Sequence, residues 1–196
     1  MIRSIRTYTD DYLRRHRTTH AKHPEFGTHR HPYLHATMGR MAAAAGPLPS
    51  LLDYGCGKGA FLAEMRRLGL FSEVVGTDPA VAAFRARPDR RFDVVSCLDI
   101  LDQIEERFVP AVIEDVAQFT AGVAVFSVIT RQSPAFAHLK PRSALAWRQV
   151  IERRMRVVST EIRTASAWEI ATEGACPERL ILTAANAIGS NERGDA

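Results

Sequence analysis

Residues 50–65 read SLLDYGCGKGAFLAEM, and this stretch decides the fold. Leu51 and Leu52 before Asp53 are typical of a short buried strand. Three glycines follow within five residues, and an apolar periodic segment from Ala60 predicts a helix that Gly69 can end. Glycine permits a tight turn and close approach of a ligand, and the start of a helix offers free N–H groups. The stretch therefore predicts a ligand site at a strand-to-helix turn.

Strand and helix patterns alternate beyond this turn. The expected strands are 74–77, 92–97, 123–129, 156–162 and 180–184, with a possible further strand at 168–171, and the expected helices are 80–85, 108–119 and 143–154. Such alternation predicts an α/β domain with a largely parallel sheet that helices cover on both faces. Ligands of such sheets bind at the carboxyl ends of the strands, where the glycine turn lies.

Residues 1–46 differ from the rest of the chain. They contain helical patterns at 10–17 and 33–45, and the sequence GPLP at 46–49 separates them from the first strand. Residues 1–40 contain eight Arg or Lys and three Asp or Glu, and six of the seven histidines lie within 16–35. We expect a basic helical extension over 1–46, a ligand-binding domain over 47–196, and either an anionic partner for the extension or a solvated basic helix.

Asp53 distinguishes between two kinds of cofactor. The spacing Gly55-x-Gly57-x-x-Ala60 also satisfies the fingerprint of dinucleotide-binding folds. A carboxylate two residues before the first glycine would repel a pyrophosphate, but it suits a cationic cofactor. Asp78, at the end of the next strand, is placed to accept hydrogen bonds from ribose hydroxyls, or to cap a helix that begins near Pro79. A P-loop is excluded because its Gly-Lys-Ser/Thr sequence is missing.

Three segments carry a family resemblance. LLDYGCGKG at 51–59 resembles the first motif of class I S-adenosylmethionine-dependent methyltransferases, GTDP at 76–79 resembles the second, and residues 92–104 resemble the segment around the fourth strand. The set is similar to small bacterial and phage methyltransferase-like proteins over about residues 50–130. The resemblance implies a doubly wound, mostly parallel, seven-stranded type of sheet. The third-strand region is expected to be shortened or absent, because only residues 79–91 separate Asp78 from Phe92.

The resemblance also implies the cofactor and its site. S-adenosylmethionine is expected to contact Asp53, Tyr54, Gly55, Cys56, Gly57, Gly59, Asp78, Pro79, Leu98 and Asp99. The expected catalytic residues are Asp99 and His35, and the expected acceptor-binding residues are Tyr33, His35, Asp102, Arg131 and His138. For Asp102, capping of a helix is an alternative interpretation.

Other classes of partner are disfavoured. No apolar run is long enough to cross a bilayer, and no signal peptide is visible at the N-terminus, so no membrane association is expected. Three scattered cysteines predict reduced thiols and a cytoplasmic location. The clustered histidines lack Cys or carboxylate partners, so no metal is expected. Residues 133–136 lack the second proline of enzymes that methylate amino groups of DNA bases, which disfavours nucleic acid.

Two classes of function follow from this pattern. The first is methyl transfer from S-adenosylmethionine to a small or medium-sized, possibly anionic, acceptor by in-line displacement. The second is an S-adenosylmethionine-binding protein that is not itself an active methyltransferase. In the first class, residues 1–46 are expected to fold over the cofactor cleft as a lid and to help form the acceptor site.

Overall fold

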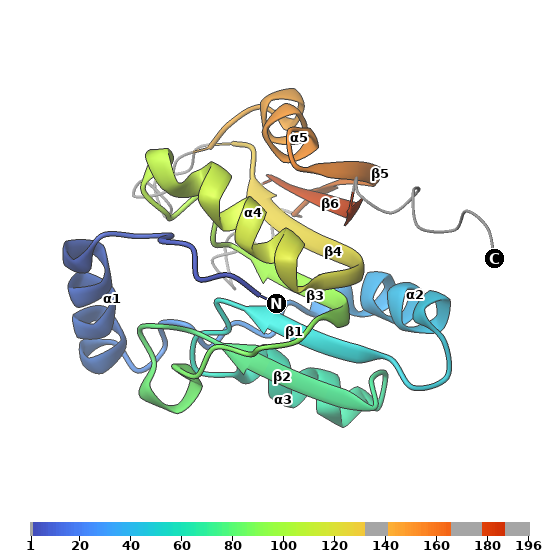
Figure 1. The fold of residues 1–196 in the computed structure, drawn as a ribbon, viewed down its shortest axis with the longest axis horizontal. Helices are drawn as coiled ribbons and strands as arrows, with labels where there is room; N and C mark the ends of the chain where they lie inside the picture. Colours follow the sequence, from blue (N-terminus) through green and yellow to red (C-terminus); the bar gives the residue numbers. More distant parts are fainter. Residues whose placement is uncertain (1, 132–140, 166–177, 187–196) are drawn as a thin grey trace.

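A computed structural model describes residues 2–131, 141–165 and 178–186 of the chain (Figure 1). Helices and strands alternate along most of its length. The elements are α1 (Asp10–Lys22), α2 (His35–Ala45), β1 (Ser50–Tyr54), α3 (Ala60–Leu68), β2 (Glu73–Thr77), β3 (Phe92–Leu98), α4 (Val109–Phe119), β4 (Thr120–Ile129), α5 (Ala144–Glu152), β5 (Met155–Thr164) and β6 (Glu178–Asn186), with short 3-10 turns at Pro32–Leu34, Ala82–Phe84 and Glu106–Phe108.

The described strands form one sheet in the order β2-β1-β3-β4-β6-β5. The first four strands of this order are parallel, and β6 runs antiparallel to both β4 and β5. The carboxyl ends of β1, β2 and β3 therefore meet at one edge. Non-consecutive neighbours such as β1 and β3 require the crossover connections that the predicted alternation of strands and helices supplies. This arrangement confirms the predicted α/β class with a mostly parallel sheet.

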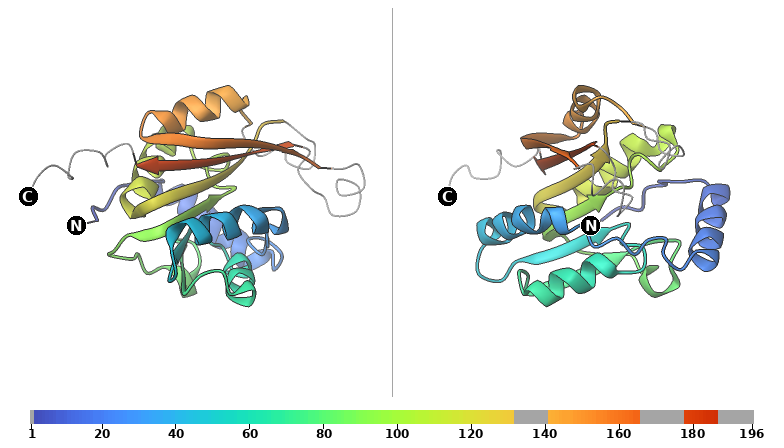
Figure 2. Two further views of the ribbon diagram at one scale, coloured as in Figure 1. Left: turned by 90° about the vertical axis from the view of Figure 1, so that its right-hand side faces the viewer. Right: turned by 180° about the vertical axis from the view of Figure 1, so that it is seen from behind.

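Helices cover both faces of the sheet, as Figures 1 and 2 show. Successive residues of a strand point to opposite faces, so each strand contributes to two cores. One core contains Leu52 and Val95 with residues of α4 and α5, and the other contains Leu51 and Val94 with residues of α2 and α3. Both cores are closed to solvent, and they hold the strand ends of the glycine turn in a fixed position.

The connection between β2 and β3 is short, as the residue count predicts. Residues 79–91 contain a three-residue 3-10 turn at Ala82–Phe84 in place of the expected helix at 80–85. Consequently β1 lies directly between β2 and β3, and β2 is an edge strand among the described residues. The described sheet has six strands, where the family resemblance implied a seven-stranded type. The possible strand at 168–171 lies outside the described residues.

The N-terminal segment contacts the sheet at two places. Leu34, Met38 and Ala42 are buried in the core on the face that α2 covers. Helix α1 has no buried residue and stands at the carboxyl ends of the strands, at the left of Figure 1. The boundary at residue 46 stays a prediction. None of the helices in the described ranges is long and apolar enough to span a membrane.

Substitution of Met38 tests whether α2 is an integral part of the core. The Met38 side chain is fully buried, so Met38→Ala leaves a cavity and should lower the free energy of unfolding by about 2–4 kcal/mol. Urea denaturation measures this change. Leu145→Ala on α5 is the control, because Leu145 is 65% exposed and its loss should cost well under about 1 kcal/mol. Equal effects of the two substitutions would contradict the packing of α2.

Candidate active site

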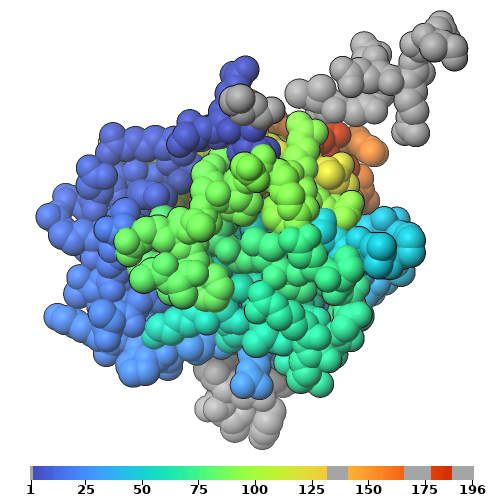
Figure 3. Space-filling model, turned by 60° about the horizontal axis from the view of Figure 1, so that its bottom comes forward, coloured from blue at the N-terminus to red at the C-terminus, as the bar shows by residue number. Residues whose placement is uncertain are grey.

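A cavity of about 200 Å³ lies where the carboxyl ends of β1, β2 and β3 face the N-terminal segment. The space-filling view in Figure 3 shows the N-terminal residues beside the surface of the segment that follows β2. The cavity is lined from both sides. The N-terminal segment supplies Thr7, Tyr8, Tyr12, Leu13, His16, His20, Phe26, Gly27, His29 and His31, and the rest of the chain supplies Asp53, Tyr54, Gly55, Cys56, Gly57, Phe61, Asp78, Pro79, Ala80, Leu98, Asp99, Ile100, Gln103, Ile104 and Val112.

The glycine turn contacts the N-terminal segment directly. Gly57 has a φ of 54°, and a Cβ atom there would lie 2.6 Å from the carbonyl oxygen of Gly27. The next residue, Lys58, donates its backbone N–H to that oxygen at 2.7 Å and its Nζ to the carbonyls of His23 and Pro24 at 2.8 Å. In the described structure, the close approach that requires glycine at position 57 is made by protein backbone.

Two buried carboxylates line the cavity near this turn. Asp53 accepts a hydrogen bond from Ser96 Oγ at 2.7 Å, and no Lys, Arg or His of the described chain pairs with it. Burial raises the pKa of Asp53 to about 7. Asp78 accepts from the backbone N–H of Gly57 at 3.0 Å and of Ala80 at 2.8 Å, and burial raises its pKa as well. Asp78 thus anchors the glycine turn to the end of β2.

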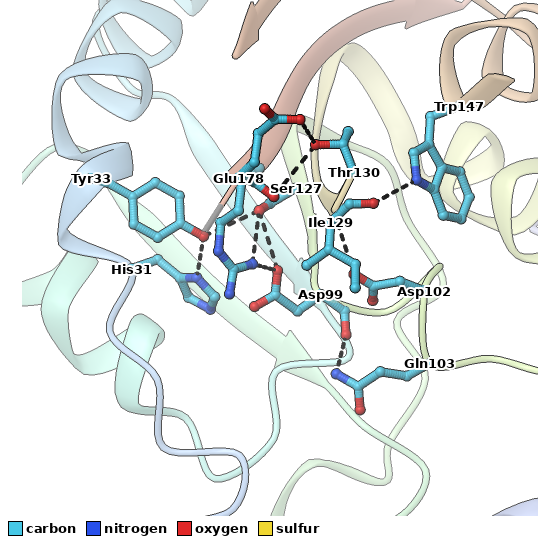
Figure 4. Close-up of polar contacts among 11 residues, drawn as sticks. His31, Tyr33, Asp99, Asp102, Gln103, Ser127, Ile129, Thr130, Trp147 and Glu178 are labelled. Atoms are coloured by element: carbon cyan, nitrogen blue, oxygen red, sulfur yellow. Dashed lines mark hydrogen bonds and ion pairs between the residues drawn. The ribbon is translucent and has the colours of Figure 1, made fainter. Parts of the chain in front are cut away.

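Asp99 is a third carboxylate in the cavity wall, with a different environment. Its φ of 57° is left-handed, a conformation that Asp tolerates better than most residues. The carboxylate pairs with Arg179 of β6 and accepts from Ser127 Oγ of β4 at 3.2 Å (Figure 4). Burial opposes ionisation of Asp99, but the charge and hydrogen bond of the Arg179 guanidinium hold its pKa below the ordinary value. Asp99 is therefore ionised at neutral pH.

His31 faces Asp99 across a short chain of hydroxyl groups. Its Nδ1 lies 2.9 Å from the Tyr33 hydroxyl, which lies 3.1 Å from Ser127 Oγ (Figure 4). Burial lowers the pKa of His31 to about 3, so its imidazole is uncharged. Burial also lowers the pKa of His16 to about 4, and it lowers the pKa values of His20 and His29. The histidines of the cavity are thus neutral ring side chains.

The structure brings most of the predicted cofactor residues together. Nine of the ten line the cavity: Asp53, Tyr54, Gly55, Cys56, Gly57, Asp78, Pro79, Leu98 and Asp99. The tenth, Gly59, is left out of the lining and has a φ of 81° at the start of α3, where a Cβ atom would meet Phe84. The roles of these residues toward a ligand remain predictions.

The predicted acceptor residues are more scattered. His35 is outside the cavity lining, and its Nε2 lies 3.4 Å from Glu64 of α3. Asp102 turns into the core and accepts from the backbone N–H of Ile129 at 3.0 Å, and burial raises its pKa to about 7. Tyr33 is outside the cavity lining and contacts the lining residue His31 and, through Ser127, Asp99. Arg131 is exposed beyond β4, and His138 lies outside the described residues.

Sequence reasoning did not single out His31, which lines the cavity, or Ser127 and Arg179, which contact Asp99. Ser127 is the polar residue inside the apolar run VAVFSVI, and Arg179 precedes the apolar run of β6. Both are buried. A polar residue in a buried strand needs a partner, and this signal could have marked both positions. Within the described ranges, no cluster of three or more His, Cys, Asp or Glu side chains is arranged to hold a metal ion.

Comparison with known proteins identifies a family. Residues 9–167 match the model of a family described as a methyltransferase domain. A stretch of 53 residues is 43% identical to ribosomal protein L11 methyltransferase from Methylobacillus flagellatus, and it covers 27% of this chain and 18% of that protein. The family match includes the glycine turn, most of the sheet and all cavity-lining residues except Thr7 and Tyr8.

Solved structures share the fold at low sequence identity. A 1,6-didemethyltoxoflavin-N1-methyltransferase from Burkholderia thailandensis, with bound 1,6-didemethyltoxoflavin and S-adenosylhomocysteine, superposes with a TM-score of 0.66 at 14% identity, covering 94% of this chain and 93% of that one. A magnesium protoporphyrin IX methyltransferase from Synechocystis PCC 6803 with bound S-adenosylmethionine gives a TM-score of 0.62 at 14% identity, covering 93% of this chain and all of that one.

The raised pKa of Asp53 predicts how stability depends on pH. A carboxyl group with a higher pKa in the folded than in the unfolded state destabilises the fold once it is ionised, and this cost grows as the pH rises from about 4 to about 7. Asp53→Asn removes this group but keeps an acceptor for Ser96. The unfolding free energy of the variant minus that of the native chain should therefore increase by about 1–3 kcal/mol from pH 5 to pH 8.

Urea denaturation at the two pH values measures this gain. Asp89→Asn is the matched control, because Asp89 is exposed and the substitution should leave the difference between pH 5 and pH 8 unchanged. If the unfolding free energies of the Asp53→Asn and native proteins change equally from pH 5 to pH 8, burial of this carboxyl group has no thermodynamic cost.

Proposed function

Because the chain belongs to the family of proteins with a methyltransferase domain, we propose that it transfers a methyl group from S-adenosylmethionine to a small or medium-sized acceptor. The donor supplies an electrophilic methyl group on a sulfonium, and the transfer is an in-line displacement. The protein's part in such a reaction is to orient the two reactants and to set the electrostatics around them.

The charge of the cavity wall carries this proposal. Its charged side chains are Asp53, Asp78 and Asp99, and no Lys or Arg lines the cavity in the described part of the chain. A cationic cofactor with an ammonium and a sulfonium gains from these carboxylates, and it supplies the positive charge that the buried Asp53 lacks. A dinucleotide would place its anionic pyrophosphate beside the same groups. The residues therefore fit S-adenosylmethionine.

The backbone around the glycine turn supports a placement for this cofactor. The first turn of α3, from Ala60, offers N–H groups to the carboxylate of the methionine part, while the N–H groups of residues 55–57 are bonded to Thr77 and Asp78 and hold the turn in shape. Asp78 is placed for the ribose hydroxyls. Its two oxygens already accept backbone N–H groups, but each carboxylate oxygen has a second lone pair to offer. Leu98 and Asp99 at the end of β3 then lie beside the reacting methyl group.

The N-terminal segment is the second part of the proposal. It forms one wall of the cavity with the rings of Tyr8, Tyr12 and Phe26, and Lys58 ties it to the glycine turn. We infer that this segment acts as a lid that excludes water and contacts the acceptor. The neutral histidines and the absence of Lys or Arg from the described lining favour an uncharged acceptor over an anionic one.

Calorimetry with two adenosine-containing cofactors tests the proposed donor. We expect S-adenosylmethionine to bind and nicotinamide adenine dinucleotide not to bind. Asp53→Asn should weaken S-adenosylmethionine binding by about 10- to 100-fold, because it removes a charged partner worth about 1.5–3 kcal/mol. The exposed Asp89→Asn is the control and should bind normally. Binding of the dinucleotide alone would refute the proposed cofactor. Binding without any S-adenosylhomocysteine formation across diverse acceptors would favour a binding protein that is not an active methyltransferase.

Hydrogen exchange tests the proposed lid without knowledge of the acceptor. Helix α1 has no buried residue, so its amides should exchange readily in the free protein. Saturation with S-adenosylhomocysteine should slow exchange over residues 10–27 by about tenfold or more, while the exposed end of α5 stays unchanged. Lys58→Met should reduce this protection, because it removes the contacts of Nζ with His23 and Pro24. Unaltered exchange in α1 on ligand binding would mean that the segment is not a lid.

A further inference from the structure

A continuous chain of hydrogen bonds begins and ends in the cavity wall. It runs from His31 Nδ1 to the Tyr33 hydroxyl at 2.9 Å, on to Ser127 Oγ at 3.1 Å, and to Asp99 Oδ1 at 3.2 Å (Figure 4). His31 and Asp99 both line the cavity, while Ser127 is fully buried. The chain thus connects two sides of the site through the interior of the protein.

The ionised carboxylate at one end fixes the direction of every hydrogen bond. Asp99 is paired with Arg179 and, as a carboxylate, can only accept hydrogen bonds. Ser127 therefore donates its one hydroxyl hydrogen to Asp99. Ser127 Oγ then accepts from Tyr33, and Tyr33 in turn accepts from His31 Nδ1–H. An uncharged imidazole carries a single proton. His31 is therefore the Nδ1–H tautomer, and its Nε2 has a free lone pair.

The surroundings of His31 keep this lone pair available. Nε2 has no hydrogen-bond partner among the described residues, and the ring packs edge-on against His29 and Phe61 with centroid distances of 4.6 and 5.6 Å. The charged and titratable groups that face it are Asp99, Arg179, His29 and Tyr33. None of them competes as a donor to Nε2 in the described structure. A ligand in the cavity can therefore donate a hydrogen bond there.

We propose that His31 is a catalytic residue that takes the proton of the acceptor through Nε2, and that the acceptor is an uncharged ring compound with an O–H or ring N–H group. The proposal rests on the methyl-transfer function proposed above. Tyr33 and Ser127 act as positioning residues, because they hold the imidazole in the tautomer that presents Nε2. Other rings that the N-terminal segment contributes to the cavity lining, including Tyr12 and His16 stacked at 4.0 Å, suit a planar acceptor.

The proton and electron balance of this step is closed. A bond forms between the acceptor oxygen or nitrogen and the methyl carbon while the sulfur–methyl bond breaks, and its electron pair stays on sulfur. The proton of the acceptor passes to His31 Nε2. The imidazolium keeps its Nδ1–H bond to Tyr33, and the Asp99 carboxylate stabilises its charge through the chain. The proton returns to water when the methylated product leaves.

The burial of His31 restricts the class of acceptor. Burial makes the imidazolium form of His31 a strong acid. His31 therefore takes a proton only from a group that is a stronger acid than this imidazolium. A methylated hydroxyl or a methylated electron-poor ring nitrogen is such an acid while it still carries its proton. An aliphatic ammonium is a far weaker acid and would keep its proton. The site is therefore suited to phenol-like hydroxyls and ring N–H groups and unsuited to aliphatic amines.

Nitrogen NMR of the ring tests the tautomer directly. Protein with ¹⁵N-labelled histidine is saturated with S-adenosylhomocysteine, and long-range proton–nitrogen spectra are recorded between pH 6 and pH 8. His31→Asn assigns the signal, since Asn tolerates the left-handed φ of 47° at this position. We expect a neutral Nδ1–H ring throughout. Tyr33→Phe should shift the ring toward the Nε2–H tautomer. Tyr8 also lines the cavity but takes no part in these hydrogen bonds, so Tyr8→Phe should not shift it.

Addition of phenol and of anisole tests the acceptor contact. Phenol carries an O–H group and anisole does not, so phenol alone should move the Nε2 resonance of the cofactor-saturated protein. A protonated ring, an Nε2–H tautomer or an equal response to both compounds would overturn the proposal. If S-adenosylhomocysteine binds but the ring is Nε2–H, this inference fails and the proposed function stands. If neither S-adenosylmethionine nor S-adenosylhomocysteine binds, both fail.

Discussion

Two glycines, Gly27 and Gly57, let the N-terminal segment and the turn after β1 come into backbone contact. A Cβ atom at Gly57 would lie 2.6 Å from the Gly27 carbonyl oxygen, and one at Gly27 would lie 2.6 Å from the His20 ring. Because neither side chain exists, the Lys58 N–H reaches the Gly27 oxygen and α1 is held over the strand ends. This backbone contact, together with the hydrogen bonds of Thr9 to Glu105 and of Tyr33 to Ser127, holds one wall of the cavity in place.

The cavity wall contains three carboxylates that differ in the partners compensating their burial. Asp99 is compensated by a full positive charge on Arg179, so it remains ionised although it is buried. Asp53 has only a hydroxyl donor, and Asp78 has two backbone N–H donors. Burial of carboxyl groups with neutral partners costs stability, and such costs are typical of positions that serve a ligand. The uncompensated groups lie beside the glycine turn, where a cationic ligand would supply the missing charge.

The sequence predicts the scaffold better than the site. Alternating periodicities and the glycine turn predict β1, α3 and the parallel sheet because these features are local, and the count of residues 79–91 predicts the missing third strand. The sequence analysis named His35, but which histidine of this stretch lines the cavity depends on the exact start of α2. His35 opens α2 and faces Glu64, whereas His31 precedes it in a left-handed conformation and turns into the cavity. Arg179 meets Asp99 through an antiparallel register that no local pattern encodes.

The position of His31 follows from anchors on both sides of it. Gly27 is fixed to the glycine turn by Lys58, and Tyr33 is fixed to β4 by its hydrogen bond to Ser127. Only five residues lie between these two anchors, so the chain between them has little freedom to move the imidazole. The residues of an N-terminal extension are usually more mobile than those of a sheet. Here hydrogen bonds to the sheet and to the glycine turn hold the segment, and they fix the His31 ring beside Asp99.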